Sequence, residues 1–500
     1  MYLTLVIVAA ILLLLTVLFV RFMSASHDTF KKMGIDTPPT SWILGNFGQA
    51  IKYGVFEVQK VYYNQYKDKK VYGWYDSRRP NLIIRDLDMV KDIFVKNFNS
   101  FVDRHTLFDV DLPFRDNLLN LRGDHWKHVR SIVSPTFSSG RIKKMSTHIE
   151  RNSKILVDHL HSKMESGEEV ELRDICSCFT LDVIASTGFG LEINTLKDPN
   201  NEFATQAKKV LNPNPFLFTL LLFIPELTKF FSKLNIPILP QKSLLYFAKV
   251  VDLAIEERKR DGLNGKINDF LDLVINAEVD NTDKDGGHSG KELTRSEIHA
   301  QAIVLIFAGY DTVATVLSFT LFLLAMHPDC CQKVQAEIDE KCGEEFPNYD
   351  SVQGLTFLDM CINEAMRLFP PGIFINRACV QDTEIHGVHI PKGMVVLIPV
   401  YAFHTDPEIF PEPEKFDPER FTPDNKSSRH PFAHLPFGQG PRNCIGMRLA
   451  LVELKIAIAA ILGKLTPVPC SKSVYPVKLG KIRTNAKDGL WVKFQLRNRV

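Results

Sequence analysis

One uninterrupted helical pattern constrains the fold of this chain more than any other feature. Residues 294–297 read Thr-Arg-Ser-Glu, a capping box, and the apolar pattern then continues without proline to His327-Pro328. The pattern predicts one helix of about 33 residues, near 50 Å long at about 1.5 Å per residue. A helix of that length would cross an entire domain, so we expect it to run through the protein core.

The same helix is apolar enough to be mistaken for a membrane span. Asp311 lies inside it, and a carboxylate at the centre of a transmembrane helix costs about 2.5 to 3.5 kcal/mol. A core helix is therefore favoured. The 500 residues exceed the usual single core of roughly 250 to 300, which leaves open two or three domains or one unusually large fold.

Composition and charge narrow the class of protein. The chain is 45% hydrophobic and 24% charged, which is ordinary for a globular protein. Its 60 basic and 58 acidic side chains give a formal net charge of only +2, so no nucleic-acid partner is predicted. The nine cysteines are odd in number and lack the spacing of a zinc module, which suits a reducing compartment.

The N-terminal segment predicts a membrane anchor. Tyr2 to Val20 carries no charge and is almost wholly apolar, close to the roughly 20 residues that span a bilayer. Arg21, Lys31 and Lys32 follow it, which favours a lumenal N-terminus and a cytosolic body. A cleaved signal peptide is the alternative, but the apolar stretch is longer than is typical of one.

Three parts follow from this reading of the chain. Residues 1–23 are expected to form the anchor, and residues 24–39 a basic linker that ends at the stiff pair Pro38-Pro39. Residues 40–500 are expected to form the folded body.

The body is predicted to be mainly α-helical with small β-sheets. Strand patterns predict a hairpin over residues 70–84 and a second between Thr383 and Phe403. Helical periodicity covers most other segments, including 127–149, 181–189 and 246–260. The polar, Gly-rich stretch 280–291 is expected to be a surface loop.

The strongest chemical signal is the run Phe-Gly-Gln-Gly-Pro-Arg-Asn-Cys-Ile-Gly at residues 437–446. Glycines allow the backbone to approach a flat cofactor, and loop amides can donate hydrogen bonds to a thiolate. Arg442 can pair with an anionic group, and Cys444 just before a helix would have a lowered pKa that suits a metal ligand. The residues alone leave a cysteine nucleophile open, although no neighbouring histidine supplies a base.

This run resembles the heme-binding loop of the cytochrome P450 superfamily, with matches at Phe437, Gly440, Arg442, Cys444 and Gly446. Three further matches follow the family's order along the chain. They are Trp126-Lys127-His128-Val129-Arg130, Ala308-Gly309-Tyr310-Asp311-Thr312, and Glu364-Ala365-Met366-Arg367 together with Arg420. Alone, the second would be an ordinary helix with a small-residue notch, and the third a solvated ion pair.

The resemblance extends from about Pro38 to the C-terminus and looks closest to clan three, which contains the liver drug-metabolising enzymes. It implies a helix-rich prism around a buried heme b (iron protoporphyrin IX), preceded by one transmembrane helix. Cys444 would be the axial metal ligand. The implied cofactor-binding residues are Arg104, Trp126, Arg130, Ala308, Arg377, Phe437, Arg442, Cys444 and Gly446.

The resemblance also implies roles for polar residues around the heme. Asp311 and Thr312 would relay protons to dioxygen. Glu364, Arg367 and Arg420 would form a buried structural lock beside the heme loop.

Monooxygenation is the reaction that this resemblance implies, because a thiolate ligand favours cleavage of the O–O bond. One oxygen atom would enter a lipophilic substrate such as a xenobiotic, steroid or fatty acid, by hydroxylation or epoxidation. Electrons would come from NADPH through NADPH-cytochrome P450 reductase, with cytochrome b5 as a candidate second donor. Lys91, Lys96 and Lys127 are candidate docking charges, and the expected location is the cytoplasmic side of the endoplasmic reticulum membrane.

The predicted substrate pocket is apolar, which points to lipophilic substrates. The Phe-rich stretch 216–231 is hypothesised to be a lid that dips into membrane lipid, with plain core as the alternative. Residues 371–376 depart from the liver enzymes, so their substrate range is not transferred. The pocket candidates are Phe108, Phe216, Phe307, Ala308, Ile373 and Phe374.

Two other functions remain open from the sequence. A heme-thiolate isomerase or dehydratase would need neither reductase nor external oxygen, but such relatives tend to lose the acid-alcohol pair kept here as Asp311 and Thr312. A non-catalytic heme sensor would need Cys444 but no proton relay.

Overall fold

A computed structural model of the chain describes most of its 500 residues. The described residues are 1–497 without 107–112, 213, 215, 218–219, 222–223, 225–226, 235, 261–269 and 276–291. Phe108 and the whole of the predicted loop 280–291 therefore lie outside the described residues.

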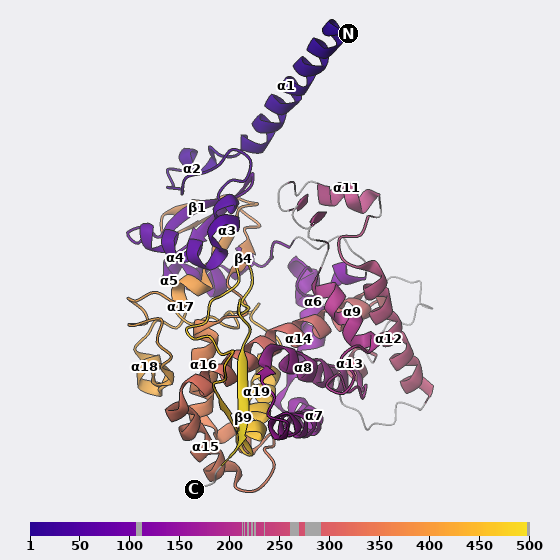
Figure 1. Cartoon of the computed structure of the whole chain (residues 1–500). Coiled ribbons are helices and arrows are strands. Elements are labelled where there is room, and N and C mark those ends of the chain that lie inside the picture. The colour runs from indigo at the N-terminus through magenta and orange to yellow at the C-terminus, as the bar shows by residue number, and fades with distance from the viewer. Residues whose placement is uncertain are drawn as a thin grey trace.

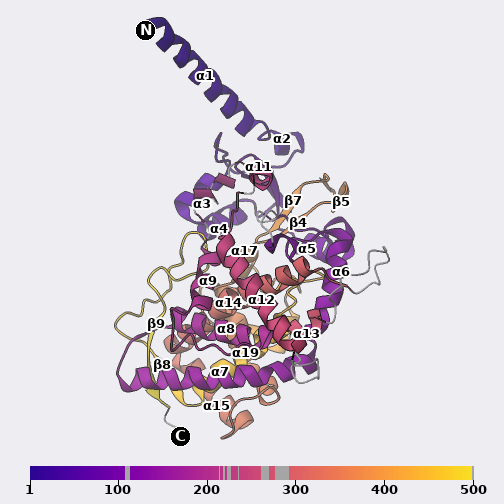
Figure 2. The same ribbon diagram turned by 90° about the vertical axis from the view of Figure 1, so that its right-hand side faces the viewer.

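The long apolar pattern forms one helix, α14 (Arg295–Met326), of 32 residues. Thr294 and Glu297 form the predicted capping box, each side chain accepting a hydrogen bond from the other residue's amide. In Figures 1 and 2, α14 crosses the middle of the body. Its most apolar 18-residue window is 72% buried, so α14 is a core helix, as predicted.

Helices α7 (Ser139–Glu165), α8 (Leu172–Phe189), α16 (Thr356–Leu368) and α19 (Met447–Leu462) build the main core together with α14. Helix α8 packs along α14, and α19 packs against α7. A Cβ atom at Gly309 would lie 2.9 Å from Cδ1 of Ile184. The glycine therefore lets α8 and α14 approach closely.

The remaining helices flank this core. The α-helices are α2 (Thr29–Lys32), α3 (Phe47–Tyr53), α4 (Val55–Gln65), α5 (Leu87–Lys91), α6 (Gly123–Val133), α9 (Glu202–Leu211), α11 (Leu227–Lys233), α12 (Gln241–Arg260), α13 (Phe270–Ile275), α15 (Pro328–Cys342), α17 (Val400–His404) and α18 (Pro423–Ser427). The 3-10 turns are η2 (Phe98–Ser100), η3 (Phe114–Asp116), η4 (Ser134–Phe137), η5 (Ser351–Gly354) and η6 (Pro418–Phe421), and η1 (Asp92–Lys96) is a π-helical turn.

The helical pattern predicted over residues 127–149 is two helices rather than one. Helix α6 ends at Val133, the turn η4 follows, and α7 starts at Ser139. Pro135 lies in this turn, and it has no amide hydrogen with which to continue a helix. The break lets α6 run in a different direction from α7 (Figure 2).

The largest sheet has the strand order β1-β2-β7-β4. The predicted hairpin is formed by β1 (Val71–Asp76) and β2 (Arg79–Ile84), which pair antiparallel. Strand β7 (Val395–Ile398) pairs parallel to β2 and antiparallel to β4 (Ile375–Ala378). The sheet therefore joins segments more than 300 residues apart in the sequence.

The second predicted hairpin is shorter than expected. It consists of β5 (Thr383–Ile385) and β6 (Val388–Ile390), and the turn at Pro391–Gly393 instead leads the chain to β7 in the larger sheet. A three-stranded sheet has the order β3 (Val170–Glu171), β9 (Trp491–Leu496), β8 (Leu465–Val468). The prediction of a mainly α-helical fold with small β-sheets is confirmed.

Helix α1 (Tyr2–Ser24) projects from the body (Figure 1). Its side chains are exposed or half-buried except for Met23, and its length and composition would allow it to cross a membrane. The linker that follows is packed rather than extended: Phe30 is buried, and its ring lies 5.1 Å from that of Tyr75 in β1. Helices α2, α3 and α11 lie at the same end of the body as α1 (Figures 1 and 2).

Candidate functional site

A cavity of about 340 Å³ lies between α14 and the loop that carries Cys444. One face of α14 forms part of its wall at a helical spacing, with Leu305, Ala308, Gly309, Thr312, Val313 and Val316. The loop contributes Leu435–Gly438 and Arg442–Gly446, and α19 contributes Leu449, Ala450, Glu453 and Leu454. The predicted cofactor-binding residues all line this one cavity.

The cysteine loop is a series of tight turns. The amide of Cys444 donates to the carbonyl of Phe437 at 2.9 Å, and the amide of Asn443 donates to that of Gly440 at 3.1 Å. Gly440 has φ +77°, and a Cβ atom there would overlap the carbonyl oxygen of Phe94. Only glycine fits this position, and the loop consequently presents Cys444 close to the start of α19.

Opposing influences act on the Cys444 thiol. Burial raises the pKa of the thiol above its ordinary value, so the lowered pKa predicted from the sequence is wrong for this structure. The amides of Gly446 and Met447 and the guanidinium groups of Arg104 and Arg130 act in the opposite direction and favour the thiolate. All nine cysteines are described, and Cys444 is the one that lines the cavity. No histidine is among the described residues that line the cavity, so they offer Cys444 no base of the kind that a cysteine nucleophile needs.

Three arginines at the cavity, the buried Arg377 and Arg442 and the half-buried Arg104, have little anionic compensation. The Nε atoms of Arg104, Arg377 and Arg442 are buried without a hydrogen-bond partner. Within the described residues, Asp103 is the one carboxylate paired with any of them, 3.9 Å from Nη1 of Arg442. Burial lowers the pKa of Arg377, and it lowers that of Arg442 to about 9, with neighbouring guanidinium groups acting in the same direction.

Backbone carbonyls hold these guanidinium groups in place. Arg104 donates to the carbonyl of Arg442 at 3.0 Å, Arg377 to that of Asn376 at 2.8 Å, and Arg442 to that of Leu121 at 2.6 Å. Carbonyl dipoles do not neutralise a full charge, so the cluster can accept anionic groups in the cavity.

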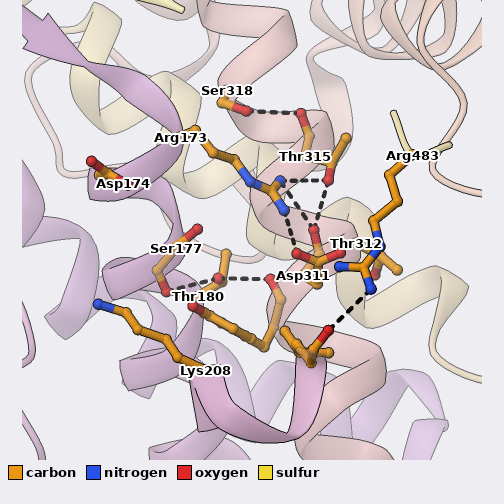
Figure 3. Close-up of polar contacts among 12 residues, drawn as sticks. Arg173, Asp174, Ser177, Thr180, Lys208, Asp311, Thr312, Thr315, Ser318 and Arg483 are labelled. Atoms are coloured by element: carbon orange, nitrogen blue, oxygen red, sulfur yellow. Dashed lines mark hydrogen bonds and ion pairs between the residues drawn. The ribbon is translucent and has the colours of Figure 1, made fainter. Parts of the chain in front are cut away.

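Asp311 and Thr312 point in different directions from α14. Thr312 lines the cavity, and its hydroxyl donates to the carbonyl of Ala308 at 2.5 Å. Asp311 does not line the cavity; its carboxylate forms an ion pair with Arg173 of α8. Figure 3 shows Arg173 reaching from α8 to Asp311 and Thr315. The Asp311 side chain is 44% exposed, so it can exchange protons with water outside the cavity.

Glu364 and Arg367 form a fully buried ion pair on α16. Arg367 donates from Nε and Nη2 to the two carboxylate oxygens at 2.7 and 2.8 Å. Arg420 is 3.4 Å from Glu364. Arg367 also donates to the carbonyls of His404 and Lys415 at 2.7 and 3.2 Å. The three predicted lock residues therefore lie together and connect α16 to the irregular segment before the cysteine loop.

Comparisons with known proteins agree with this geometry. Residues 36–488 match the family model described as Cytochrome P450. The chain belongs to the cytochrome P450 family. It is 40% identical to cytochrome P450 3A16 of Mus musculus over 483 residues, covering 96% of this chain and 93% of that protein. It is also 40% identical to cytochrome P450 3A7 of Homo sapiens over 469 residues, covering 93% and 91% of the two chains.

Family membership makes this chain a P450 monooxygenase with a heme held by a cysteine thiolate. The cavity fits that cofactor. It has a cysteine at a helix start and an apolar helix face in its wall, and its unpartnered buried arginine nitrogens suit two propionate carboxylates. Every residue that the resemblance to cytochromes P450 implies as a heme contact lines this cavity.

Of the residues predicted to contact substrate, only Ala308 lines the cavity within the described part of the chain. Ala308 lines the cavity of this cytochrome P450, but Phe307 does not; its ring packs 5.6 Å from that of Phe247. Pro371, Gly372 and Ile375 line the cavity in place of Ile373 and Phe374. Phe216 is 73% exposed, and Phe108 lies outside the described residues.

Several cavity residues were missed from the sequence. Ile184 comes from α8, and Val313 and Val316 continue the α14 face that starts at Leu305 and Ala308. The spacing of the α14 residues was a usable signal. No sequence signal pointed to Glu453 of α19. Its side chain is buried, its Oε1 has no hydrogen-bond partner, and burial raises its pKa well above the ordinary value.

Glu364→Gln should destabilise the protein by about 3 kcal/mol, because it leaves the Arg367 charge buried without its counterion. The measurement is chemical denaturation of the holoprotein, followed by near-ultraviolet circular dichroism and heme absorption. Asp359→Asn is the matched control on α16, since Asp359 pairs with Lys455 at 3.0 Å and its side chain is 38% exposed. It should cost less than about 1 kcal/mol. Equal losses in the two variants would contradict the lock.

Proposed function

We propose that this protein is a membrane-bound P450 monooxygenase in which Cys444 is the axial heme ligand, and that it oxidises lipophilic small molecules. The supporting observation is the cavity itself, whose wall combines Cys444 with the α14 face around Thr312. The bound heme would activate dioxygen so that one oxygen atom enters the substrate and the other leaves as water. The chain's own residues bind the cofactor, orient the substrate and move protons.

Cofactor binding is assigned to the cavity residues predicted from the sequence. Arg104, Arg377 and Arg442 would pair with the propionates, because their Nε atoms are buried without a hydrogen-bond partner and their charges lack sufficient counterions. Arg130 would join them or hold the loop, since its Nη2 lies 3.3 Å from Oδ1 of Asn443. Trp126, Ala308, Phe437 and Gly446 would contact the ring.

Cys444→Ser should abolish the strongly red-shifted heme absorption band that appears when the reduced protein binds carbon monoxide. The shift depends on the thiolate, which serine cannot supply. Cys470→Ser is the matched control, because Cys470 does not line the cavity, and it should keep the parent spectrum. An unshifted band in the parent, or a shifted one in Cys444→Ser, would exclude Cys444 as the ligand.

Proton delivery is assigned to Thr312 and Asp311 together. Thr312 offers a hydroxyl inside the cavity, while Asp311, the residue before it on α14, reaches water. The ion pair with Arg173 holds the carboxylate away from Thr312. A proton would pass when Asp311 leaves Arg173 and turns toward Thr312, which makes Arg173 a positioning residue.

Asp311→Asn should lower the rate of product formation about 100-fold and raise its solvent deuterium isotope effect, because an amide cannot carry the proton. Substrate turnover in light and heavy water is the measurement. Asp174→Asn is the control: Asp174 lies on α8 near Arg173 but is exposed and makes no contact with Asp311 (Figure 3). Parent-like turnover and isotope effect in Asp311→Asn would remove Asp311 from the relay.

The substrate is proposed to be lipophilic because most of the wall around the reactive position is apolar. Ile184, Leu305, Val313, Val316 and Ile375 all line the cavity. Hydroxylation or epoxidation of xenobiotic, steroid or fatty-acid substrates fits such a wall. The oxygen-activating pair of Thr312 and Asp311 favours monooxygenation over the isomerase and sensor functions.

NADPH-cytochrome P450 reductase is the proposed electron donor, with cytochrome b5 as an additional one. The candidate docking lysines are exposed, but two of them have acidic neighbours: Lys96 lies 3.5 Å from Asp92, and Lys127 lies 3.0 Å from Asp124. These pairs reduce the net positive charge that a docking partner would meet. Lys91 remains a candidate because of its positive charge and its exposure.

The proposed location is the cytoplasmic face of the endoplasmic reticulum membrane. Residues 1–23 would form the anchor, 24–39 the linker and 40–500 the catalytic domain. A second contact with lipid is proposed for the Phe-rich segment around α11, which lies at the α1 end of the body. Phe216, Phe230 and Leu234 are 73%, 53% and 53% exposed there, as expected for a dipping lid.

Protein lacking residues 1–23 should stay bound to phospholipid vesicles in low salt without detergent, because the lid still inserts apolar side chains. Vesicle flotation is the measurement. Phe230→Glu should release the truncated protein, whereas Leu496→Glu should not, because Leu496 is 59% exposed and belongs to β9, which lies away from α1 and α11 in Figure 1. A freely soluble truncated protein would refute the dipping lid.

A further inference from the structure

A second cavity, of about 430 Å³, shares no lining residue with the heme cavity. It lies where the junction of α3 and α4 meets the C-terminal half of α14, the end of α16 and the segment 475–481. Its volume is within the range of roughly 300 to 1,000 Å³ that small-molecule sites occupy. Nothing in the proposed monooxygenase chemistry uses it.

The inner wall of this cavity is apolar and aromatic. Phe56, Leu323, Leu368, Phe369 and Leu479 line it. The ring of Phe56 meets that of Tyr401 edge-on at 4.9 Å, and Phe369 stacks on Phe319 at 4.2 Å. These ring contacts fix the shape of the wall, which suits the apolar body of a ligand.

The mouth of the cavity carries five charged side chains. Lys60 and Glu414 neutralise each other in an ion pair of 2.6 Å. Lys478 and Lys481 remain, opposed by the exposed Glu57. The ammonium group of Lys481 donates to the carbonyls of Ile51 and Lys52 at 3.4 and 3.0 Å, and an ammonium can make a third hydrogen bond. The mouth therefore has one excess positive charge.

The surroundings of the mouth place it near the proposed membrane surface. Helix α3, which ends at Tyr53, lies at the α1 end of the body in Figures 1 and 2. Tyr53 and Ile482 beside the mouth are 56% and 60% exposed. Exposed apolar side chains next to lysines are typical of surfaces that contact an anionic lipid interface.

We propose that this second cavity binds an amphipathic anion, with its apolar body against Phe56, Leu323 and Phe369 and its anionic group at Lys478 and Lys481. The ligand would be a carboxylate or sulfonate that partitions to the membrane surface. The aromatic inner wall holds the body, the excess charge at the mouth selects the sign, and the exposed apolar rim gives a route from lipid.

A thin partition separates the two cavities. Leu368 and Phe369 line the second cavity, while Met366, Pro371 and Gly372 of the same segment line the heme cavity. The carbonyl of Pro370 accepts a hydrogen bond from Thr484 at 2.6 Å, which ties this segment to the chain just beyond Lys481. A ligand in the second cavity therefore acts on the wall of the first cavity and would be an effector of the heme site. This effector role rests on the proposed function.

The test uses full-length holoprotein in phospholipid nanodiscs, with an iron-binding azole filling the heme cavity. The probe is 1-anilinonaphthalene-8-sulfonate, an apolar body with one sulfonate, and empty nanodiscs give the lipid background. The parent should bind one probe per chain with increased fluorescence. Val477→Trp fills the cavity from segment 475–481 and should weaken probe binding by about tenfold or more. Val474→Trp, three residues earlier and outside the lining, should change it less than about twofold.

A charge-reversal pair keeps the test valid if Val477→Trp fails to incorporate heme. Lys478→Glu should weaken probe binding about fivefold, whereas Lys487→Glu, on the neighbouring strand of chain and outside the lining, should not. Saturable binding that is equal in all four variants, or absent in the parent, would overturn the proposal.

Coupling between the cavities is measured by azole titration with and without the probe. By linkage, the probe should change the azole affinity of the parent by about twofold or more, and that of Val477→Trp by less. An unchanged azole affinity in the parent would overturn the effector role. The measurement needs heme and azole but no turnover, so its outcome is independent of whether the proposed oxidation of lipophilic substrates fails.

Discussion

The carboxylate of Glu364 is the point on which the arrangement of the heme site depends. It accepts hydrogen bonds from two nitrogens of Arg367 and from the amide of Asp417, and it lies 3.4 Å from Arg420. Arg367 also donates a hydrogen bond to the carbonyl of His404. The His404 ring in turn accepts a hydrogen bond from the amide of Leu435 at 3.0 Å. The cysteine loop starts two residues later. One buried acid thus positions a largely irregular segment, in which η6 and α18 are short.

The cavity above this segment combines two opposite electrostatic environments. Three of its arginines have buried Nε atoms without partners and largely uncompensated charges, while α14 and the neighbouring helices contribute an apolar wall. A flat, anionic cofactor would supply counterions to the arginines and would leave the apolar wall to contact the substrate. The apolar wall and the charged edge are therefore complementary parts of one site. With the propionate pairing proposed above, bound heme would supply the missing counterions and stabilise the protein around these arginines.

The sequence was informative where the signal was local. The capping box at Thr294 and Glu297, the proline-free pattern that follows it, and the glycines around Cys444 each describe a few neighbouring residues, and the structure has them as predicted. Side-chain direction was harder, because α14 turns by about 100° per residue. Phe307 was therefore assigned to the cavity although it packs on Phe247, and the pairing of Asp311 with Arg173 depends on α8, about 140 residues away in the sequence. Strand β7 likewise depends on a long-range partner, β2, that no local pattern reveals.

The packed linker after α1 has a mechanical consequence. Met23 is buried, His27 contacts the carbonyl of Ser77 at 2.9 Å, and the guanidinium of Arg78 lies 3.8 Å from the Phe22 ring. The C-terminal end of α1 is thus fixed to the turn between β1 and β2, so the helix is rigidly attached to the body and does not act as a flexible tether. If α1 spans the membrane as proposed, a change in bilayer thickness changes its tilt, and a rigid joint passes that tilt to the whole body. Bilayer thickness would then set the angle at which the catalytic domain meets the lipid surface.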